Sequence, residues 1–255
     1  MTTTGAQAWV ADLYDDYVTA TADIPFFLEA ARGVAGPVLE LMAGTGRISL
    51  PLAEAGVHLT CVDLSGSMLA RLRAKLAAGG LRATVCEMDV ARLDLAERAF
   101  PLILLPFQSF GELLDPQDQR SALDRIATHL ADEGRFICTL HNPRVRRRTV
   151  DGQLRLLGTV PLSRRAGTLL LWSVQQSDAG SSVVRAGQIY EVYDRDGRLE
   201  EKRWLDVRFR LVEPAEFRSM AERAGFRVAA LYGNYDRTPF DEEQSPYMIW
   251  VLERS

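Results

Sequence analysis

Hydrophobic residues fall along the first part of the chain in two patterns that alternate. Short, nearly unbroken apolar runs suit strands buried on both faces, and longer segments with apolar residues every three or four positions suit helices packed on one side. The predicted strands are residues 38–42, 57–63, 83–88, 100–107 and 134–141. The predicted helices between them are residues 47–55, 66–78 and 116–131. This alternation predicts an α/β fold with a parallel sheet, right-handed crossovers and helices on both faces.

Two further helices are predicted before the first strand. Apolar residues recur at helical spacing over residues 6–20. A second helix is bounded by Asp23, Pro25 and Gly33, which suit an N-cap, a first helical turn and a helix end. Because both helices precede the strand–helix alternation, we expect residues 1–34 to form a lid.

The pattern changes after Asn142, where apolar and polar residues begin to alternate. Such alternation predicts antiparallel strands with one solvated face, and turn signals stand at 166–168 and 195–197. The predicted strands are residues 155–162, 168–175, 183–193 and 202–211. We interpret residues 143–212 as a small antiparallel β insert that covers the cleft after strand five.

The chain then returns to the main domain. Pro214 opens a predicted helix that Gly225 ends, and the last two strands are expected at 227–232 and 246–253. The loop between them is long enough for an antiparallel hairpin. The predicted domain therefore comprises residues 1–142 and 213–255, with the insert between the two parts.

Composition and charge narrow the class of protein. A chain of 255 residues with 47% hydrophobic and 25% charged residues is typical of a globular protein. A net charge of −4 argues against binding to nucleic acid by bulk electrostatics. Cys61, Cys86 and Cys138 have no metal-ligand spacing and are expected to be buried thiols. With neither a secretory signal nor an apolar run of membrane length, we expect a cytoplasmic monomer or homodimer without membrane partners.

The most informative stretch is V-L-E-L-M-A-G-T-G-R-I-S-L at 38–50. It predicts a buried strand, a turn of small residues and the start of a helix. Gly44 and Gly46 allow positive φ and let a ligand approach the backbone without meeting a Cβ. The N-terminus of the helix that follows favours an anion.

This stretch and several later motifs resemble the class I S-adenosylmethionine-dependent methyltransferases. The matching segments are E-L-M-A-G-T-G at 40–46, D-L-S-G-S-M at 63–68, Asp89-Val90, H-L-A-D-E-G-R-F at 129–136 and A-G-F at 224–226. The resemblance covers most of the chain and implies a Rossmann-like doubly wound sheet, mostly parallel, with an antiparallel last strand. Met42 departs from the family, which often has its first glycine at that position.

The resemblance implies a site for S-adenosylmethionine, released as S-adenosylhomocysteine, and no metal. Asp63 would accept both ribose hydroxyls, Asp89 and the backbone of Val90 would bind adenine, and Glu40 would help to hold the ammonium end. The full set of expected cofactor contacts is Tyr17, Glu40, Ala43, Gly44, Gly46, Asp63, Leu64, Met68, Asp89, Val90 and Leu105. Two alternatives remain: the aspartates can be ordinary turn acids at strand ends, and Met68 can belong to the helix core.

Two other functions fit the same topology less well. A nicotinamide-dependent oxidoreductase would need a glycine at position 49, which is Ser49, and has no use for Glu40 inside the first strand. A cofactor-binding protein without catalytic activity is the other alternative, and binding without turnover would favour it.

The loop after strand four indicates what is methylated. L-P-F-Q-S-F-G-E-L-L at 105–114 lacks the Asn-Pro-Pro-aromatic motif of amide and nucleobase amino methylases and the Pro-Cys nucleophile of cytosine C5 enzymes. It also lacks an acidic cluster for Mg²⁺. The loop and the layout resemble bacterial N- or O-methyltransferases of small metabolites, with those acting on amino sugars and glycine-like amines nearest in layout.

The candidate catalytic groups are Glu112 after strand four, His141 at the end of strand five, and Tyr14 or Tyr17 on the lid. A structural histidine and a core-facing pair of tyrosines are the alternatives for the last three. Gln108, Ser109 and Tyr235 are further candidates to line the cleft.

A basic run opens the insert, at Arg144, Arg146, Arg147 and Arg148. It is either a solvated face or a site for an acidic or phosphorylated acceptor such as a nucleotide sugar.

Overall fold

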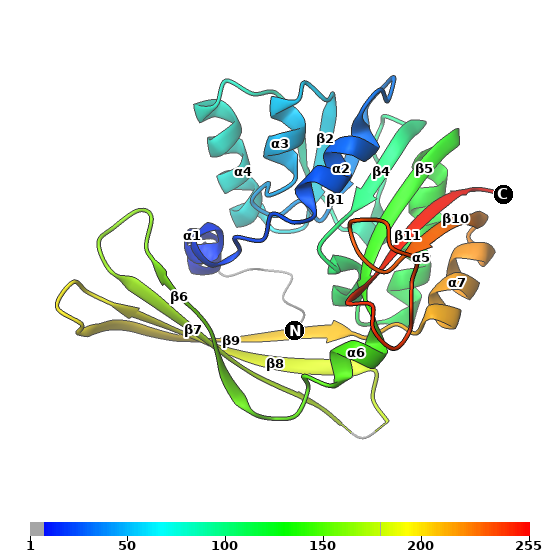
Figure 1. The fold of residues 1–255 in the computed structure, drawn as a ribbon. Helices are drawn as coiled ribbons and strands as arrows, with labels where there is room; N and C mark the ends of the chain where they lie inside the picture. The colour runs from blue at the N-terminus through cyan, green and yellow to red at the C-terminus, as the bar shows by residue number, and fades with distance from the viewer. Residues whose placement is uncertain (1–7, 179) are drawn as a thin grey trace.

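The computed structural model describes residues 8–178 and 180–255, and it contains two β-sheets (Figure 1). The larger sheet has seven strands in the order β10-β11-β5-β4-β1-β2-β3. Its strands are β1 (Val38–Leu41), β2 (Leu59–Asp63), β3 (Thr84–Glu87), β4 (Phe100–Leu105), β5 (Leu130–His141), β10 (Phe226–Tyr232) and β11 (Tyr247–Arg254). β11 pairs antiparallel with both β5 and β10, whereas β3, β2, β1, β4 and β5 are parallel. The predicted doubly wound sheet with an antiparallel last strand is confirmed.

Helices cover both faces of this sheet, because its central strands alternate their apolar side chains between two cores. In β4, Leu102 and Leu104 belong to one core and Ile103 and Leu105 to the other. The first core is completed by α2 (Ile24–Ala31), α3 (Ser49–Glu54) and α4 (Gly66–Ala78). The second is completed by α5 (Pro116–His129), α7 (Pro214–Arg223) and the 3₁₀ helices η1 (Val90–Arg92) and η2 (Ser109–Glu112).

Several element boundaries differ from the prediction, and two of them lie next to the expected site or in the core of the large sheet. β4 ends at Leu105 because Pro106 has no backbone N–H to continue the ladder, and Phe107 and Gln108 then both adopt φ near 60°. The helix expected to reach residue 131 ends at His129, and β5 begins at Leu130 in the next residue.

The insert is a separate antiparallel sheet in the order β6-β7-β8-β9. α6 (Pro143–Arg147) leads from β5 into it, and its strands are β6 (Leu154–Pro161), β7 (Thr168–Ser177), β8 (Val183–Tyr193) and β9 (Leu199–Arg210). Figure 1 shows this sheet crossing beneath the larger domain, with β9 leading back to α7. We call the face that carries the buried side chains of Leu169, Leu171 and Ser173 the inner face of the insert.

α1 (Ala8–Tyr17) lies between the insert and α4 (Figure 1). Val10 and Ala11 pack on Met68 of α4, and Tyr17 packs on the inner face of the insert. Asp12 pairs with Arg71 and Asp15 pairs with Lys75, so α1 is tied to α4 by charge as well as by packing. α1 therefore closes one side of the space between the two sheets.

α2 is not part of a lid, contrary to our expectation for residues 1–34. Its Phe27 is fully buried, and Phe26, Ala30 and Ala31 belong to the same core as Leu52 of α3. α2 packs there because the apolar face of a short helix is stabilised wherever a larger apolar surface is available. Residues 1–7 of the predicted lid lie outside the described residues.

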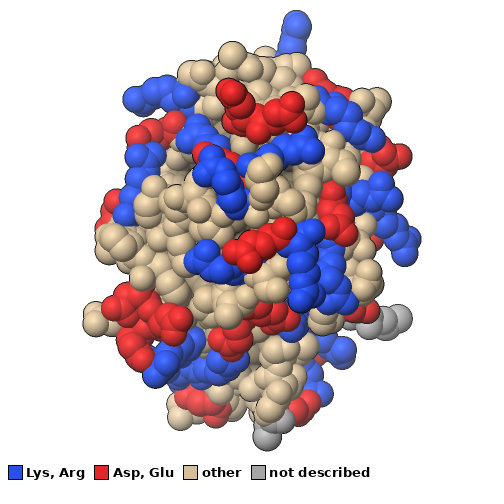
Figure 2. Space-filling model, turned by 90° about the vertical axis from the view of Figure 1, so that its right-hand side faces the viewer, with Lys and Arg blue, Asp and Glu red and all other residues tan. Residues whose placement is uncertain are grey.

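Surface charge is mixed in sign. Figure 2 shows acidic and basic side chains interspersed over one face. Cys61 and Cys138 are buried free thiols, as expected, while Cys86 is half-buried. None of the helices in the described part of the chain is long and apolar enough to cross a bilayer. Within residues 8–178 and 180–255, no group of His, Cys, Asp and Glu side chains is arranged to hold a metal ion.

Candidate functional site

The turn after β1 has the geometry that a ligand-cradling loop requires. Met42, Gly44 and Gly46 all have positive φ, at 56°, 58° and 93°. A Cβ on Gly46 would lie 2.4 Å from Leu72 Cδ1, so packing demands glycine there, whereas a Cβ on Gly44 would meet no atom within 4 Å. Met42 adopts the left-handed conformation without being glycine, so its departure from the family pattern leaves the turn intact.

Asp63 joins this turn to the end of β2. Its Oδ2 accepts a hydrogen bond from the Gly44 N–H at 2.8 Å, and its Oδ1 accepts one from the Ser65 N–H at 2.8 Å. Burial raises the pKa of the Asp63 carboxyl, and these backbone N–H donors oppose the rise. The carboxylate is therefore held in a fixed orientation at the carboxyl end of the strand, with lone pairs left for a ligand.

Glu40 lies beneath the same turn. Its side chain is 1% exposed, and its Oε2 accepts a hydrogen bond of 2.6 Å from the Ser49 hydroxyl. Burial raises its pKa to about 8. A cationic ligand group above the turn would favour the ionised form of Glu40. In that form Glu40 could help to hold the ammonium end of the cofactor, as we expect from the sequence.

Arg47, which follows the turn, is fixed from two sides. It donates to both oxygens of Asp23 at 2.5 and 2.6 Å, and its guanidinium lies 4.4 Å from the centre of the Phe107 ring. These contacts connect α2 to the strained loop after β4.

Asp89 stands at the corresponding end of β3. Its Oδ1 accepts a hydrogen bond of 2.9 Å from the Ala91 N–H, so Asp89 caps the start of η1. Val90, the first residue of η1, is buried, with 5% of its surface exposed. Leu64 follows Asp63 with 38% of its surface exposed, although it is apolar. Asp63, Leu64 and Asp89 thus lie at neighbouring strand ends, since β2 and β3 pair in parallel.

Several predicted cofactor contacts have side chains that other groups enclose. Leu105 is fully buried in the core, so only its backbone can reach a ligand. Met68 packs under Val10 and Ala11 of α1. This packing agrees with the alternative interpretation of Met68 as a residue of the hydrophobic core, which is formed here between α4 and α1. Ala43 is also buried, at 6% exposure.

Aromatic side chains of α1 meet the insert at the cleft. The rings of Tyr14 and Tyr17 lie 5.5 Å apart at their centres, as do those of Tyr17 and Tyr190, and the Tyr17 and Tyr190 hydroxyls are hydrogen-bonded at 3.0 Å. Burial raises the pKa of Tyr14 well above its usual value, and the negative charges of Glu112 and Asp63 raise it further. Tyr14 is therefore a neutral hydrogen-bonding group that faces both acids.

Glu112 ends η2, on the loop that follows β4. Its side chain is accessible to small molecules, yet protein atoms surround it closely, and this desolvation raises its pKa to about 7. The nearby negative charge of Asp63 acts in the same direction. A carboxyl group with a pKa near neutrality, on the loop after the carboxyl end of β4, is suited to accept a proton during catalysis.

The loop that carries Glu112 is held in a strained conformation. Phe107 and Gln108 have left-handed backbones in succession, and the Gln108 N–H donates to Thr139 Oγ1 at 3.1 Å. The Gln108 side chain donates to the Tyr235 hydroxyl at 3.4 Å, which joins the last loop to the loop after β4. Consecutive left-handed residues are typical of functional sites, where surrounding contacts compensate for the strain.

Comparison with known proteins agrees with this geometry. Residues 38–134 match a family model described as a methyltransferase domain. Over its whole length the chain resembles the structure of the CcbJ methyltransferase from Streptomyces caelestis, with 29% identity, a TM-score of 0.80 and coverage of 98% of that chain. The chain is therefore similar to methyltransferases, in sequence over residues 38–134 and in fold over its whole length.

The sequence relatives match either part of the chain or nearly all of it. An uncharacterised protein of Mycobacterium tuberculosis is 35% identical over 104 residues, and that match spans 41% of this chain and only 36% of the relative. A cypemycin N-terminal methyltransferase from Streptomyces sp is 27% identical over 95% of this chain and 94% of the relative. Full-length similarity is therefore to the second protein.

The residues at the carboxyl ends of β1, β2 and β3 fit the cofactor of this family. Gly44 leaves open space beside the turn, the Asp63 carboxylate is already oriented, and Leu64 offers an exposed apolar surface. S-Adenosylmethionine presents a ribose diol, an adenine and a charged amino acid end, which match an acceptor carboxylate, an apolar surface and a helix N-terminus. The individual contacts remain predictions.

A surface hollow of about 670 Å³ lies elsewhere in the protein. It is lined at the amino ends of the strands by residues that include Gly36, His58 and the ends of α2 and α3. Ligands of doubly wound sheets bind at the carboxyl ends, so we do not assign this hollow to the reaction.

His141 ends β5 on the acceptor side of the cleft. Its ring centre lies 5.3 Å from that of Phe209 in β9. Burial lowers the pKa of His141 to about 3, and the positive charge of Arg146 acts in the same direction. His141 is therefore neutral at pH 7 and a weak base, which makes Glu112 the better candidate for proton transfer.

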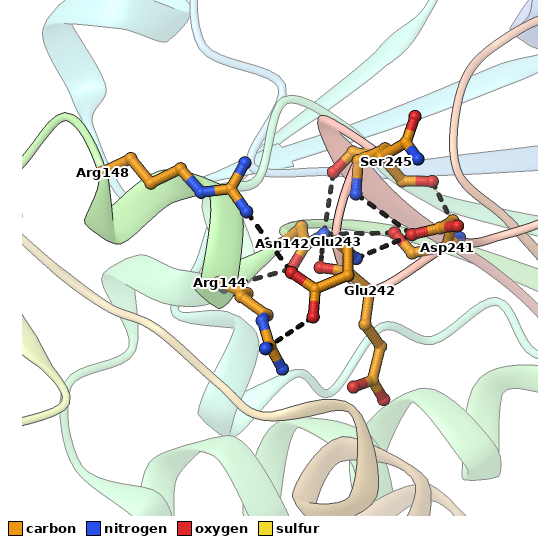
Figure 3. A network of polar contacts seen from close by, with 8 residues as sticks. Asn142, Arg144, Arg148, Asp241, Glu242, Glu243 and Ser245 are labelled. Carbon is orange, nitrogen blue, oxygen red and sulfur yellow. Dashed lines mark hydrogen bonds and ion pairs between the residues drawn. The ribbon is translucent and has the colours of Figure 1, made fainter.

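The basic run divides into paired arginines and one exception. Figure 3 shows Arg144 and Arg148 both pairing with Glu243 in the last loop. The side-chain amide of Asn142 donates to three backbone carbonyls of that same loop. Arg147 pairs with Glu213. For these three arginines the solvated-face interpretation describes the structure. Arg146 instead points into the protein and contacts Gln175 and Phe209.

Some groups at the site were not identified from the sequence. Three of them come from the inner face of the insert: Tyr190, Ser173 and Gln188. Phe107 belongs to the loop after β4, and Arg47 packs on its ring. The alternating pattern of β8 indicated which residues share a face with Tyr190, but not which face turns toward the cleft.

Proposed function

We propose that this protein transfers a methyl group from S-adenosylmethionine to the nitrogen of an amine in a small metabolite, with Glu112 as the general base. The observation that carries the proposal is that Glu112, on the loop that follows β4, has a pKa that desolvation and the negative charge of Asp63 raise to about 7. An ammonium group must lose a proton before its nitrogen can attack, and a carboxylate of this pKa is matched to that task at neutral pH.

An amine is favoured over an alcohol on two grounds. Deprotonating an alcohol demands a much stronger base than a carboxylate, and neither neutral His141 nor the tyrosines supply one near pH 7. The relative that aligns with 95% of this chain is a cypemycin N-terminal methyltransferase, and its name refers to methylation at an N-terminus.

In the proposed reaction the bound cofactor supplies an electrophilic methyl group on a sulfonium. Asp63 and the turn at 42–46 orient the cofactor, and Glu112 accepts the proton of the incoming ammonium. Tyr14 and Tyr17 stay protonated and limit the entry of water from the side of α1. Positioning of this kind accounts for most of the rate in a displacement at an already activated carbon.

The two sheets divide the work in this proposal. The domain of residues 1–142 and 213–255 binds the cofactor, and the insert of residues 143–212 binds the acceptor. Contacts of the insert with α1 and with η2 support this division, because they place the insert beside the loop that carries Glu112.

The test is transfer of an isotopically labelled methyl group from S-adenosylmethionine to a panel of small amines, each paired with the alcohol of the same skeleton. We expect labelled amines, and we expect Glu112→Gln to lose most of the activity while Glu133→Gln, on an exposed residue at the distant end of β5, keeps it. Transfer to alcohols alone would contradict N-methylation. Cofactor binding without transfer to any acceptor would favour a non-catalytic binding protein.

A further inference from the structure

Large apolar side chains gather on the two edge strands of the insert. Among the residues that the structure describes, seven large hydrophobic side chains are exposed, and five of them lie on β6 or β9: Leu154, Leu156, Leu157, Leu199 and Trp204. Trp204 alone leaves 52% of its surface exposed. Monomeric proteins rarely expose contiguous apolar patches, so this clustering indicates an interaction surface.

The strand register places apolar residues in one row across the insert. Leu156 of β6 is paired with Trp172 of β7. Trp172 is paired in turn with Ile189 of β8, and Ile189 with Trp204 of β9. Directly paired residues share a face of a sheet, and Trp172 follows the inner-face residue Leu171, so its side chain leaves the opposite face. We call this opposite face the outer face of the insert, and it carries an apolar row across all four strands.

The polar atoms of the two tryptophans in the row are satisfied within the sheet. Trp172 Nε1 donates to Glu191 Oε2 at 3.0 Å, and Trp204 Nε1 donates to Asp206 Oδ1 at 2.9 Å. The Trp204 ring also lies against Gly187, where a Cβ would be 2.2 Å from its Cζ2 atom. Covering either ring would therefore leave no indole N–H without an acceptor.

No helix of the described residues covers the outer face. Figure 1 shows α1 and the larger domain on the other side of the insert sheet, where α1 packs on inner-face residues. None of the hydrophobic clusters that the described residues form includes a member of the apolar row. Small-molecule sites are concave, whereas a flat apolar sheet face suits the face of another sheet.

The outer face is large enough for a stable dimer. Its four strands have 8 to 12 residues each. With a rise of about 3.3 Å per residue and about 4.8 Å between strands, they cover about 600 Å² on each copy. Two copies packed face to face would bury on the order of 1,200 Å², which is the lower end of the range for specific interfaces. The projecting indole rings add to this area.

Charges on either side of the row match a two-fold arrangement. Lys202 and Asp206 stand two residues before and two residues after Trp204 on β9, so all three share the outer face. A two-fold axis along the apolar row sets the row against itself and exchanges its flanks, so that Lys202 of one copy faces Asp206 of the second copy. An ammonium group has three donors, so Lys202 can keep its 2.8 Å bond to Glu191 Oε1 and still reach an acid across the interface.

We propose that a second copy of this chain covers the outer face, forming a two-fold dimer through the two inserts. A second copy is favoured over a membrane surface, because charges of both signs flank the row and the chain has a net charge of −4. It is favoured over an unrelated protein because the two flanks of the row complement each other. The inner faces of the two inserts then turn away from the interface, so both remain available to an acceptor. Dimer formation of this kind does not depend on methyl transfer.

The direct test is the mass of the protein in solution. Sedimentation equilibrium should give twice the chain mass of 28.4 kDa at micromolar concentration. Trp204→Lys and Leu156→Lys each place a charge in the row and should weaken dimerisation at least about thirtyfold. Ala78→Lys, which adds the same charge at an exposed position on α4, should leave the dimer unchanged.

The variants replace exposed side chains, and far-UV circular dichroism shows that each one is folded. A wild-type monomer at about 100 µM would overturn the proposal, and so would a dimer that neither Trp204→Lys nor Leu156→Lys weakens. A wild-type monomer that binds vesicles of anionic lipid through Trp204 would assign the outer face to a membrane instead and would also overturn it.

Cross-linking tests the two-fold arrangement. A mixture of ¹⁴N- and ¹⁵N-labelled protein is treated with a carbodiimide, which condenses an amine and a carboxylate in contact. We expect an amide between Lys202 and Asp206 in which each residue comes from a differently labelled chain. Lys202→Arg should abolish this product and keep the dimer, because arginine keeps the charge but supplies no amine. A dimer that gives no such product between chains would overturn the arrangement about the apolar row.

Discussion

The proton-accepting role of Glu112 makes a quantitative prediction. An ordinary glutamate with a pKa near 4.5 is fully ionised throughout the range from pH 6 to pH 8. Desolvation by the surrounding protein atoms and the charge of Asp63 raise the pKa of Glu112 to about 7. Its ionised fraction should therefore rise from about one tenth at pH 6 to about nine tenths at pH 8.

The assay is a ¹³C NMR titration of side-chain carboxyl groups in the protein without cofactor. Glu112→Gln identifies the Glu112 signal by its disappearance. Asp63→Asn provides a second check: it removes a neighbouring negative charge, so it should lower the pKa of Glu112 without abolishing the difference from an ordinary glutamate, since desolvation is the larger cause.

Kinetics complete the prediction. Removing a general base typically lowers kcat by about 10²- to 10⁴-fold, so Glu112→Gln should fall in that range at pH 7, while the matched variant Glu133→Gln stays at the wild-type value. A Glu112 signal that titrates near pH 4.5, or a Glu112→Gln variant with unchanged kcat, would refute the reasoning.

Three further changes test the cofactor turn. Gly46→Ala should destabilise the protein by about 2–4 kcal/mol in urea unfolding, because its Cβ would lie 2.4 Å from Leu72 Cδ1. Gly44→Ala should cost only about 1–2 kcal/mol of stability, because its methyl group meets no protein atom. That methyl group enters the open space beside the turn, so calorimetry should show cofactor affinity reduced at least about tenfold. Equal effects of the two substitutions on binding would contradict this assignment. Folding raises the pKa of Glu40 to about 8, so the stability that it contributes is complete below about pH 4.5 and is lost as pH rises toward 8. Glu40→Gln should therefore gain stability relative to wild type between pH 5 and pH 9, by an amount on the order of a few kcal/mol in urea unfolding, and a pH-independent difference would count against the burial argument.

Much of the large sheet could be predicted because its strands are short apolar runs that only a sheet buried on both faces explains. The turn at 42–46 was equally recognisable, since Gly44 and Gly46 stand where positive φ is needed. Met42 shows the limit of that reasoning: composition marks a glycine as permissive, but surrounding contacts can hold another residue in the same conformation.

The sequence could not show what each apolar face would cover. α1 and α2 have similar apolar patterns, but α1 packs between α4 and the insert while α2 joins the core of the sheet. Met68 likewise faces α1, which a helical pattern on α4 alone does not reveal.

The division of the basic run was also beyond sequence reasoning. Four arginines fall within five positions, and their acidic partners come from far along the chain: Glu213 stands 66 residues from Arg147, and Glu243 lies in the last loop. Only the folded chain shows that Arg146 is the one of the four without an acidic partner among the described residues.

The central claim is that the carboxyl ends of β1, β2 and β3 bind S-adenosylmethionine. The most direct test is calorimetric titration of the purified protein with S-adenosylmethionine and S-adenosylhomocysteine, beside Asp63→Ala and the control Asp94→Ala. We predict micromolar binding of both compounds that Asp94→Ala retains and Asp63→Ala loses, because Asp63 holds the turn through Gly44 N–H and is the residue expected to accept the ribose hydroxyls. Absence of binding to folded wild-type protein, or undiminished binding to Asp63→Ala, would contradict the account.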